Sequence, residues 1–419
     1  MKYITCLTCL VLLLSACADD KKYAPQEGRI TISEVRDVDS KTSSSASIQL
    51  GQGIQITHWG QAEYDSTNNK PDSAGNFTGT KVWDTSIGSG LDDDAFSIAS
   101  PVVYDGVAYT LGTGLKLTAV SMKDGKRLWQ KKLDSVVCSV KSIGLAVSQN
   151  AIFAVTGFGD VYALDHSGTI LWKKELKTNL RSAPALYQNA LAILSVTNQL
   201  YVMDTQTGSV KWTYQSLENE TNILGMGRPA IDQNLLIAAF SSGEVTAFDV
   251  KTGLIKWSNF LSGGRTFNSL TETMHISASP VIEGGNVYVT SASKKLAAYT
   301  LRSGTPVLSK TVGSDETPVV SGNAIFMINT QNELVAMDKK TGALFWSAAL
   351  ETEKKERWLS PFITGDKIMT VSTQGKVIQF DVHGKIARRF TIEKAAVAPF
   401  MIQNNLIVLT TNGDLVLYK

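Results

Sequence analysis

Cysteine, histidine and charge are all scarce in this sequence. Its 419 residues include four cysteines and four histidines, and 19% of them are charged, with Lys+Arg 40 against Asp+Glu 38. A net charge of +2 with no basic block lacks the electrostatic footprint of a nucleic-acid-binding protein, so we expect no nucleic acid as a partner. The hydrophobic fraction of 43% excludes a disordered chain.

No hydrophobic run approaches the roughly 20 residues that a membrane-spanning helix needs. The apolar stretch Leu10–Leu14 follows Lys2 and ends in small residues, which is the pattern of a secretory signal. The segment Leu14–Cys17 resembles a bacterial lipobox, which implies cleavage before Cys17 and acylation of its thiol by chains such as palmitate. Ala18, which is not an aspartate, favours the outer membrane by resemblance to enterobacterial sorting. The alternative is an ordinary signal peptide with an incidental cysteine.

These features predict a lipoprotein anchored in the cell outer membrane and facing the periplasm. We expect a signal peptide over residues 1–16, a lipidated N-terminus and flexible polar tether over residues 17–53, and a folded domain over residues 54–419. Cys138 is then the one cysteine left beyond the anchor, so an internal disulfide is excluded.

A repeat of about 45 residues fills the rest of the chain. Each copy has apolar strands, then Asp-x-x-x-Gly and a tryptophan. The aspartate is expected to accept hydrogen bonds from turn amides, the glycine to adopt a left-handed conformation, and the tryptophan to wedge between sheets. The clear copies contain these structural residues: Asp165, Asp204, Asp249 and Asp338, with Trp83, Trp129, Trp172, Trp212, Trp257 and Trp346.

Four strands per repeat are the signature of an all-β propeller. Seven complete copies run from about Ser100 to Ile392, two of them with Leu308 or Arg388 in place of tryptophan. The C-terminus adds three strands, and the stretch 79–83 near the N-terminus supplies a fourth. The sequence therefore predicts eight four-stranded antiparallel blades, the last one closed by an N-terminal strand.

The repeat resembles the pyrroloquinoline-quinone-type (PQQ-like) propeller repeat. With the lipobox and eight blades, the chain is similar to the assembly factor B family of the outer-membrane β-barrel assembly (Bam) machinery, and segments 238–244, 264–266 and 331–336 are similar to its alphaproteobacterial form. The resemblance implies a non-catalytic scaffold without cofactor. It also implies binding to the periplasmic (POTRA) domains of the barrel subunit, and help with insertion of outer-membrane proteins. Nascent outer-membrane proteins are a second kind of candidate partner.

Two long loops between successive blades are the candidate partner-binding site. They span residues 214–227 and 259–277 and combine apolar and charged residues, as protein interfaces do. In the enterobacterial form of the family, the corresponding segments carry an arginine, where this chain has Leu224, and carboxylates, which the stretch 275–277 lacks. The candidate contact residues are Ile223, Leu224, Gly225, Arg228, Arg265, Glu272 and His275. The alternative is that the loops only cap the propeller.

Two other functions stay open beside the scaffold. A PQQ-dependent dehydrogenase needs a bound quinone, calcium ligands, a catalytic aspartate and often a disulfide of adjacent cysteines, which the lone Cys138 excludes. The repeat aspartates have structural roles in turns and the four histidines are scattered, so we expect no enzyme activity and no metal site. A propeller lipoprotein that binds cell-wall glycan is the other alternative.

Overall fold

The computed structural model describes residues 46–75, 77–88, 90, 99–134, 142–217, 227–261 and 276–419. These residues form 32 strands in eight four-stranded sheets. The described ranges contain no helix, and so none that is long and apolar enough to cross a membrane. The signal peptide, Cys17, residues 18–45 of the tether and Cys138 lie outside the described residues.

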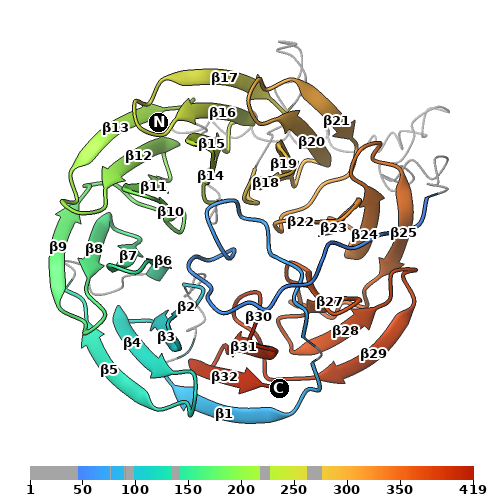
Figure 1. The fold of residues 1–419 in the computed structure, drawn as a ribbon, viewed down its shortest axis with the longest axis horizontal. Helices are drawn as coiled ribbons and strands as arrows, with labels where there is room; N and C mark the ends of the chain where they lie inside the picture. The colour runs from blue at the N-terminus through green and yellow to red at the C-terminus, as the bar shows by residue number, and fades with distance from the viewer. Residues whose placement is uncertain are drawn as a thin grey trace, which may run out of the picture. The chain divides into compact units, whose positions relative to one another are not determined.

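Each sheet is one blade, and in blades 1 to 7 the first strand lies nearest the axis and the last strand at the rim (Figure 1). Blade 1 contains β2 (Val102–Tyr104), β3 (Val107–Leu111), β4 (Lys116–Ser121) and β5 (Arg127–Lys132), and blade 2 contains β6 (Ser142–Val147), β7 (Ile152–Thr156), β8 (Asp160–Leu164) and β9 (Ile170–Glu175). Blade 3 contains β10 (Ala185–Tyr187), β11 (Ala190–Leu194), β12 (Gln199–Asp204) and β13 (Val210–Gln215), and blade 4 contains β14 (Ala230–Asp232), β15 (Leu235–Ala239), β16 (Glu244–Asp249) and β17 (Ile255–Phe260). Blade 5 contains β18 (Val281–Glu283), β19 (Asn286–Ser291), β20 (Lys295–Thr300) and β21 (Pro306–Lys310). Blade 6 contains β22 (Val319–Ser321), β23 (Ala324–Ile328), β24 (Glu333–Asp338) and β25 (Leu344–Ala349). Blade 7 contains β26 (Phe362–Thr364), β27 (Lys367–Val371), β28 (Lys376–Phe380) and β29 (Ile386–Thr391).

The eighth blade joins the two ends of the propeller. It contains β30 (Phe400–Ile402), β31 (Asn405–Leu409), β32 (Asp414–Tyr418) and, at the rim, β1 (Lys81–Ser86). Strand β1 pairs antiparallel with β32, with Asp84 opposite Val416. The predicted all-β fold, the blade count and the closure by an N-terminal strand are confirmed.

The repeat aspartates hold the turn between the third and fourth strands of their own blades. Asp165 Oδ1 accepts hydrogen bonds from the amides of Ser167 and Thr169, both at 2.9 Å. The other three clear copies make equivalent turn contacts through Asp204, Asp249 and Asp338. Each of these carboxylates thus accepts hydrogen bonds from amides of the turn that it begins.

The repeat tryptophans join neighbouring blades. Trp257 Nε1 donates to the carbonyl of Leu301 in the turn of the next blade at 2.8 Å, and its ring lies on Gly304 of that turn. Trp83, Trp129, Trp172, Trp212 and Trp346 make the same two contacts. The glycine is thus needed for its positive φ and also for the close approach of the indole. In the degenerate copies Leu308 packs against Gly342, and Arg388 donates to the carbonyl of Thr78 at 2.9 Å.

The apolar core is divided among the interfaces between blades. One cluster combines Tyr109 of blade 1 with Tyr162 of blade 2, and another combines Ala247 of blade 4 with Val287 of blade 5. Because each cluster lies between neighbours, most of the apolar stabilisation is local to pairs of blades.

A segment ahead of the first blade connects all eight blades to one another. Residues 54–75, here called the axial segment, cross the centre of the ring in Figure 1. Hydrogen bonds to Trp59, Gly60, Gln61, Ser66, Thr67, Asn69, Ser73 and Ile56 reach blades 1 to 8 in that order. The inner strands would otherwise leave backbone groups unpaired along the axis, so the segment completes their hydrogen bonding.

The described part of the expected tether also contacts the propeller. The amide of Gln49 donates to Asn323 Oδ1 at 2.8 Å, and the amide of Gly51 donates to Ser321 Oγ at 2.9 Å. Residues 46–53 therefore lie against blade 6, because their backbone groups find partners there that composition does not reveal.

Candidate partner-binding site

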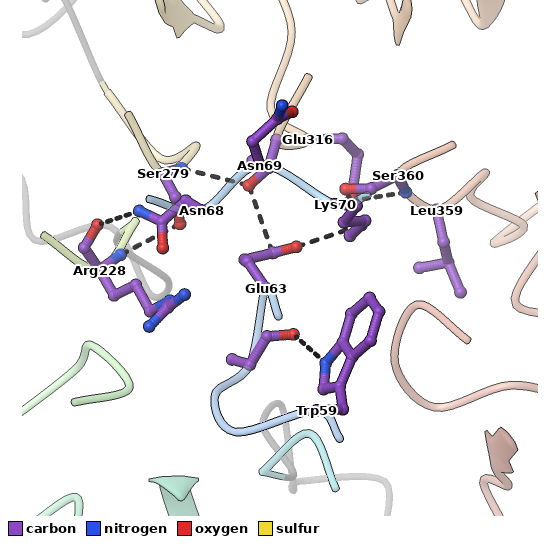
Figure 2. Close-up of polar contacts among 12 residues, drawn as sticks. Trp59, Glu63, Asn68, Asn69, Lys70, Arg228, Ser279, Glu316, Leu359 and Ser360 are labelled. Carbon is purple, nitrogen blue, oxygen red and sulfur yellow. Dashed lines mark hydrogen bonds and ion pairs between the residues drawn. The ribbon is translucent and has the colours of Figure 1, made fainter. Parts of the chain in front are cut away.

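The axial segment carries a buried polar cluster (Figure 2). Asn68 is fully buried, and its Nδ2 lies 3.3, 3.3 and 2.9 Å from the carbonyl oxygens of Arg228, Pro229 and Pro280. These carbonyls precede the inner strands of blades 4 and 5. One amide side chain thus connects the entry points of two blades.

Charged groups in this cluster have partners. Lys70 Nζ lies 3.1 Å from Glu63 Oε2, and Glu63 Oε1 accepts from Thr317 Oγ1 at 3.3 Å. Nearby, Glu316 Oε2 accepts from the amide and the hydroxyl of Ser360 at 3.0 and 2.8 Å. The buried Lys70 and the half-buried Glu63 and Glu316 thus all have partners within the protein.

Arg228 does not lie on the surface as the sequence predicted. Its side chain is buried, 2% exposed, and donates from Nη1 to Gln61 Oε1 and from Nη2 to the carbonyl of Asp65. Burial lowers the pKa of the guanidinium to about 10, with Glu63 and Asp65 opposing that shift, so it stays charged at neutral pH. Arg228 lies two residues ahead of β14, and its side chain reaches the axial segment, which a linear loop assignment cannot reveal.

The described residues do not fit a metal or an axial cofactor. Among them, no three histidine, cysteine, aspartate or glutamate side chains come together as a metal site. A planar cofactor on the propeller axis would need the volume that Trp59, Asn68 and Lys70 fill, each of them at most 3% exposed. The ring of Trp59 already stacks on Phe400 with centroids 4.3 Å apart.

Six of the seven predicted contact residues lie outside the described ranges: Ile223, Leu224, Gly225, Arg265, Glu272 and His275. The described ends of their loops are nevertheless adjacent. A Cβ added to Gly227 would lie 2.2 Å from the carbonyl oxygen of Ala278, and the amide of Arg228 donates to Ser279 Oγ at 3.2 Å. The two loops therefore end side by side, at blades 4 and 5.

The described starts of the two loops meet at a residue that the sequence analysis missed. Glu244 begins β16 and accepts hydrogen bonds from the hydroxyls of Tyr214 and Ser216, which lie at the start of the first loop. Ser258 on β17, ahead of the second loop, lies 3.4 Å from the same carboxylate. The first residue of the third strand is polar in every blade, so its pattern gave no signal that one copy joins the two loops.

Comparisons with known proteins identify the family. The family model described as outer membrane protein assembly factor BamB matches residues 75–136, 138–348 and 332–419. The chain belongs to the BamB family. Membership assigns it to outer-membrane protein assembly, the process in the family's name, and confirms the PQQ-like propeller that the repeats indicated.

Individual BamB proteins resemble the chain along most of their length. The outer membrane protein assembly factor BamB of Moranella endobia is 25% identical over 357 residues, which cover 82% of this chain and 91% of that protein. The crystal structure of BamB from Moraxella catarrhalis superposes with a TM-score of 0.70 at 20% identity, over 82% of this chain and all of that one. A quinoprotein ethanol dehydrogenase of Pseudomonas aeruginosa is 26% identical over 198 residues, 45% of this chain but 28% of the enzyme.

Proposed function

We propose that this BamB-family chain is a non-catalytic lipoprotein scaffold at the inner leaflet of the outer membrane. It binds the periplasmic POTRA domains of the barrel-forming subunit and aids insertion of outer-membrane proteins. The family match over nearly the whole propeller is the observation that carries this proposal. The contact surface lies at the adjoining ends of the loops 214–227 and 259–277.

The geometry of the described loop ends supports a single binding surface. Both loops start beside Glu244 and end beside each other at Gly227 and Ala278. Their bases are rigid, because they are fixed by hydrogen bonds to buried groups. Rigid presentation of loops lowers the conformational cost of binding.

The membrane anchor is the second part of the proposal. Acylation of Cys17 by several chains would hold the protein stably at the membrane, whereas one chain binds only marginally. The Cys17→Ser variant should lose palmitate labelling and move from the membrane fraction to the soluble periplasm. Labelled, membrane-bound Cys17→Ser protein would refute the anchor.

Binding to the purified POTRA domains tests the scaffold role. We expect the chain without residues 1–16 to bind them in a pull-down and by interferometry. Leu224→Asp and Arg265→Glu should each weaken that binding at least ten-fold. Arg389→Glu is the matched control, because Arg389 is an exposed rim residue of blade 7. Failure of the unmodified chain to bind would refute the proposed function.

The dehydrogenase alternative rests on the partial match to the ethanol dehydrogenase. The axial segment fills the space on the axis where a planar cofactor would lie, so we expect no quinone binding. Addition of pyrroloquinoline quinone with Ca²⁺ should leave the melting temperature unchanged. A concentration-dependent rise, with a bound chromophore, would revive the enzyme alternative.

A further inference from the structure

Glu244 is a buried carboxylate that is surrounded by hydroxyl groups. Its side chain accepts from Tyr214 Oη at 2.7 Å, from Ser216 Oγ and from Thr246 Oγ1 at 2.6 Å. No described lysine or arginine forms an ion pair with it. Removing a carboxylate from water is costly unless several hydrogen bonds replace its hydration, and the neighbouring strands supply them here.

Acids at the equivalent position of other blades have different surroundings. Asp160 of blade 2 lies 3.2 Å from Lys173 Nζ, and Glu333 of blade 6 accepts from Asn329 Nδ2 at 2.7 Å, within its own turn. Glu244 instead accepts from residues of the preceding blade. Burial and the hydrogen bond to Glu244 raise the pKa of Tyr214 to about 12, so its hydroxyl remains a donor at physiological pH. In blade 4, therefore, the acid that begins the third strand bonds to the preceding blade, whereas Asp160 and Glu333 bond within their own blades.

The same contacts determine where Leu217 lies. Asn198, which is fully buried, accepts from the amide of Ser216 at 3.1 Å and donates from Nδ2 to the carbonyl of Leu217 at 2.8 Å. The backbone of residues 216–217 is thus held by Asn198, while the Ser216 side chain is held by Glu244. The Leu217 side chain itself is 52% exposed.

Few of the described residues expose a large apolar side chain at the end of the propeller that carries Leu217. Among the described residues, most such side chains lie on the rim strands, where they flank the repeat tryptophans. Of the residues that the structure describes, Leu217 and Phe158 are the two at the end where the second and third strands of each blade connect. An exposed apolar side chain whose backbone is already fixed by hydrogen bonds can be buried by a partner at a low conformational cost.

We propose that Leu217 is an apolar anchor for the POTRA domains and that Glu244 is its positioning residue. This inference rests on the proposed function and adds a contact outside the seven residues that the sequence indicated. The partner accordingly presents an apolar socket to Leu217. Glu244 acts through the hydroxyls of Tyr214 and Ser216 and does not itself touch the partner.

Hydrogen exchange without any partner tests the positioning role separately. Glu244→Gln leaves one acceptor oxygen and should raise the exchange rate of the Ser216 amide at least ten-fold. Glu333→Gln is the matched control at the equivalent position, and it should leave that amide unchanged. Equal exchange at Ser216 in Glu244→Gln and the wild type would overturn the positioning role, whether or not the POTRA domains bind.

A double-mutant cycle on POTRA binding tests the anchor. Leu217→Ala should weaken binding about ten-fold, the effect of a moderate hot spot. If Glu244 acts through Leu217, the double variant should be little weaker than Leu217→Ala alone, because coupled residues are non-additive. Leu254→Ala is the control: it removes a leucine near the rim that is even more exposed, at 64%, and should bind normally.

Two results would overturn this inference while leaving the scaffold role intact: normal binding by Leu217→Ala, or fully additive losses in the double variant. No binding by the wild type refutes the proposed function instead, and the exchange experiment then still decides the role of Glu244. If Glu244→Gln does not fold, Tyr214→Phe replaces it, since it removes one hydroxyl and retains the carboxylate. Unchanged Ser216 exchange in Tyr214→Phe would count against the proposal.

Discussion

A methyl group added at Gly304, beneath the ring of Trp257, should weaken the packing between blades 4 and 5 and so lower the free energy of unfolding. Gly304 has φ +67°, and a Cβ built on it would lie 2.5 Å from Trp257 Cδ2, well inside van der Waals contact. Gly285, in another turn of the same blade, has φ +77° with open space around its Cβ position. The pair of alanine substitutions therefore separates backbone strain from collision with the indole.

The magnitudes follow from these two geometries. An L residue in the left-handed region costs about 1–2 kcal/mol, which is the whole expected effect of Gly285→Ala. Gly304→Ala carries the same strain plus overpacking worth about 1–3 kcal/mol, so we expect a total of about 2–5 kcal/mol. The difference between the two variants measures how tightly the blades are packed.

Urea unfolding followed by tryptophan fluorescence gives both free energies from the transition midpoints, provided that the slope is unchanged. In a Trp257→Ala background the extra cost of Gly304→Ala should disappear, because the colliding ring is gone. Equal destabilisation by Gly304→Ala and Gly285→Ala would refute the idea that the motif glycine is required by the neighbouring tryptophan.

Three further predictions concern the axis and the turns. Asn68→Ala should lower the unfolding free energy by about 1–3 kcal/mol in urea titrations, because buried carbonyls lose their donor. Arg228→Met should be destabilising by a similar amount, about 1.5–3 kcal/mol, yet bind the POTRA domains normally; weakened binding would restore its predicted contact role. Burial raises the pKa of Asp204, but turn amides and Lys211 outweigh it and lower the value to about 2. Its contribution is present above pH 4 and lost as pH falls toward 2, so Asp204→Asn should flatten the acid limb of thermal unfolding measured from pH 5 to 2.

The axial segment changes what stabilises this propeller. Blades that touch only their neighbours give a stability that is a sum of local terms. A segment bonded to all eight blades adds contacts that are lost together, so it favours unfolding as one cooperative unit. It also uses the inner strand edges, leaving the rim strands and the loops for partners.

Much of the fold could be predicted from the spacing of the repeat residues along the sequence. The recurrence of Asp165, Gly168 and Trp172 in register identifies one turn and one wedge per blade, because left-handed glycines and large aromatics have few alternatives. The closing strand was readable as well, since Trp83 had no blade of its own. The bounds were less accurate, with β1 at Lys81–Ser86 where residues 79–83 were expected.

The residues of the candidate site were harder to predict from the sequence. Arg228 looked like a loop residue because its neighbours are loop residues, yet its backbone direction turns the side chain to the axis. Glu244 looked like any other polar start of a third strand, and Asn68 lies ahead of the first repeat, where no pattern singled it out. Their roles depend on groups more than 15 residues away in the chain, which a periodic pattern does not encode.

The amino-acid sequence alone determined the repeat, the number of blades and the resemblance to outer-membrane assembly factors, because these follow from local turn chemistry and from the period of apolar residues. The tertiary structure decided which polar side chains are buried and what they join. Hydrogen-bond partners such as Asn68 and Pro280, or Glu244 and Tyr214, come together only when the ring closes and brings separate blades to the same place. The axis and the bases of the two loops are therefore properties of the closed ring.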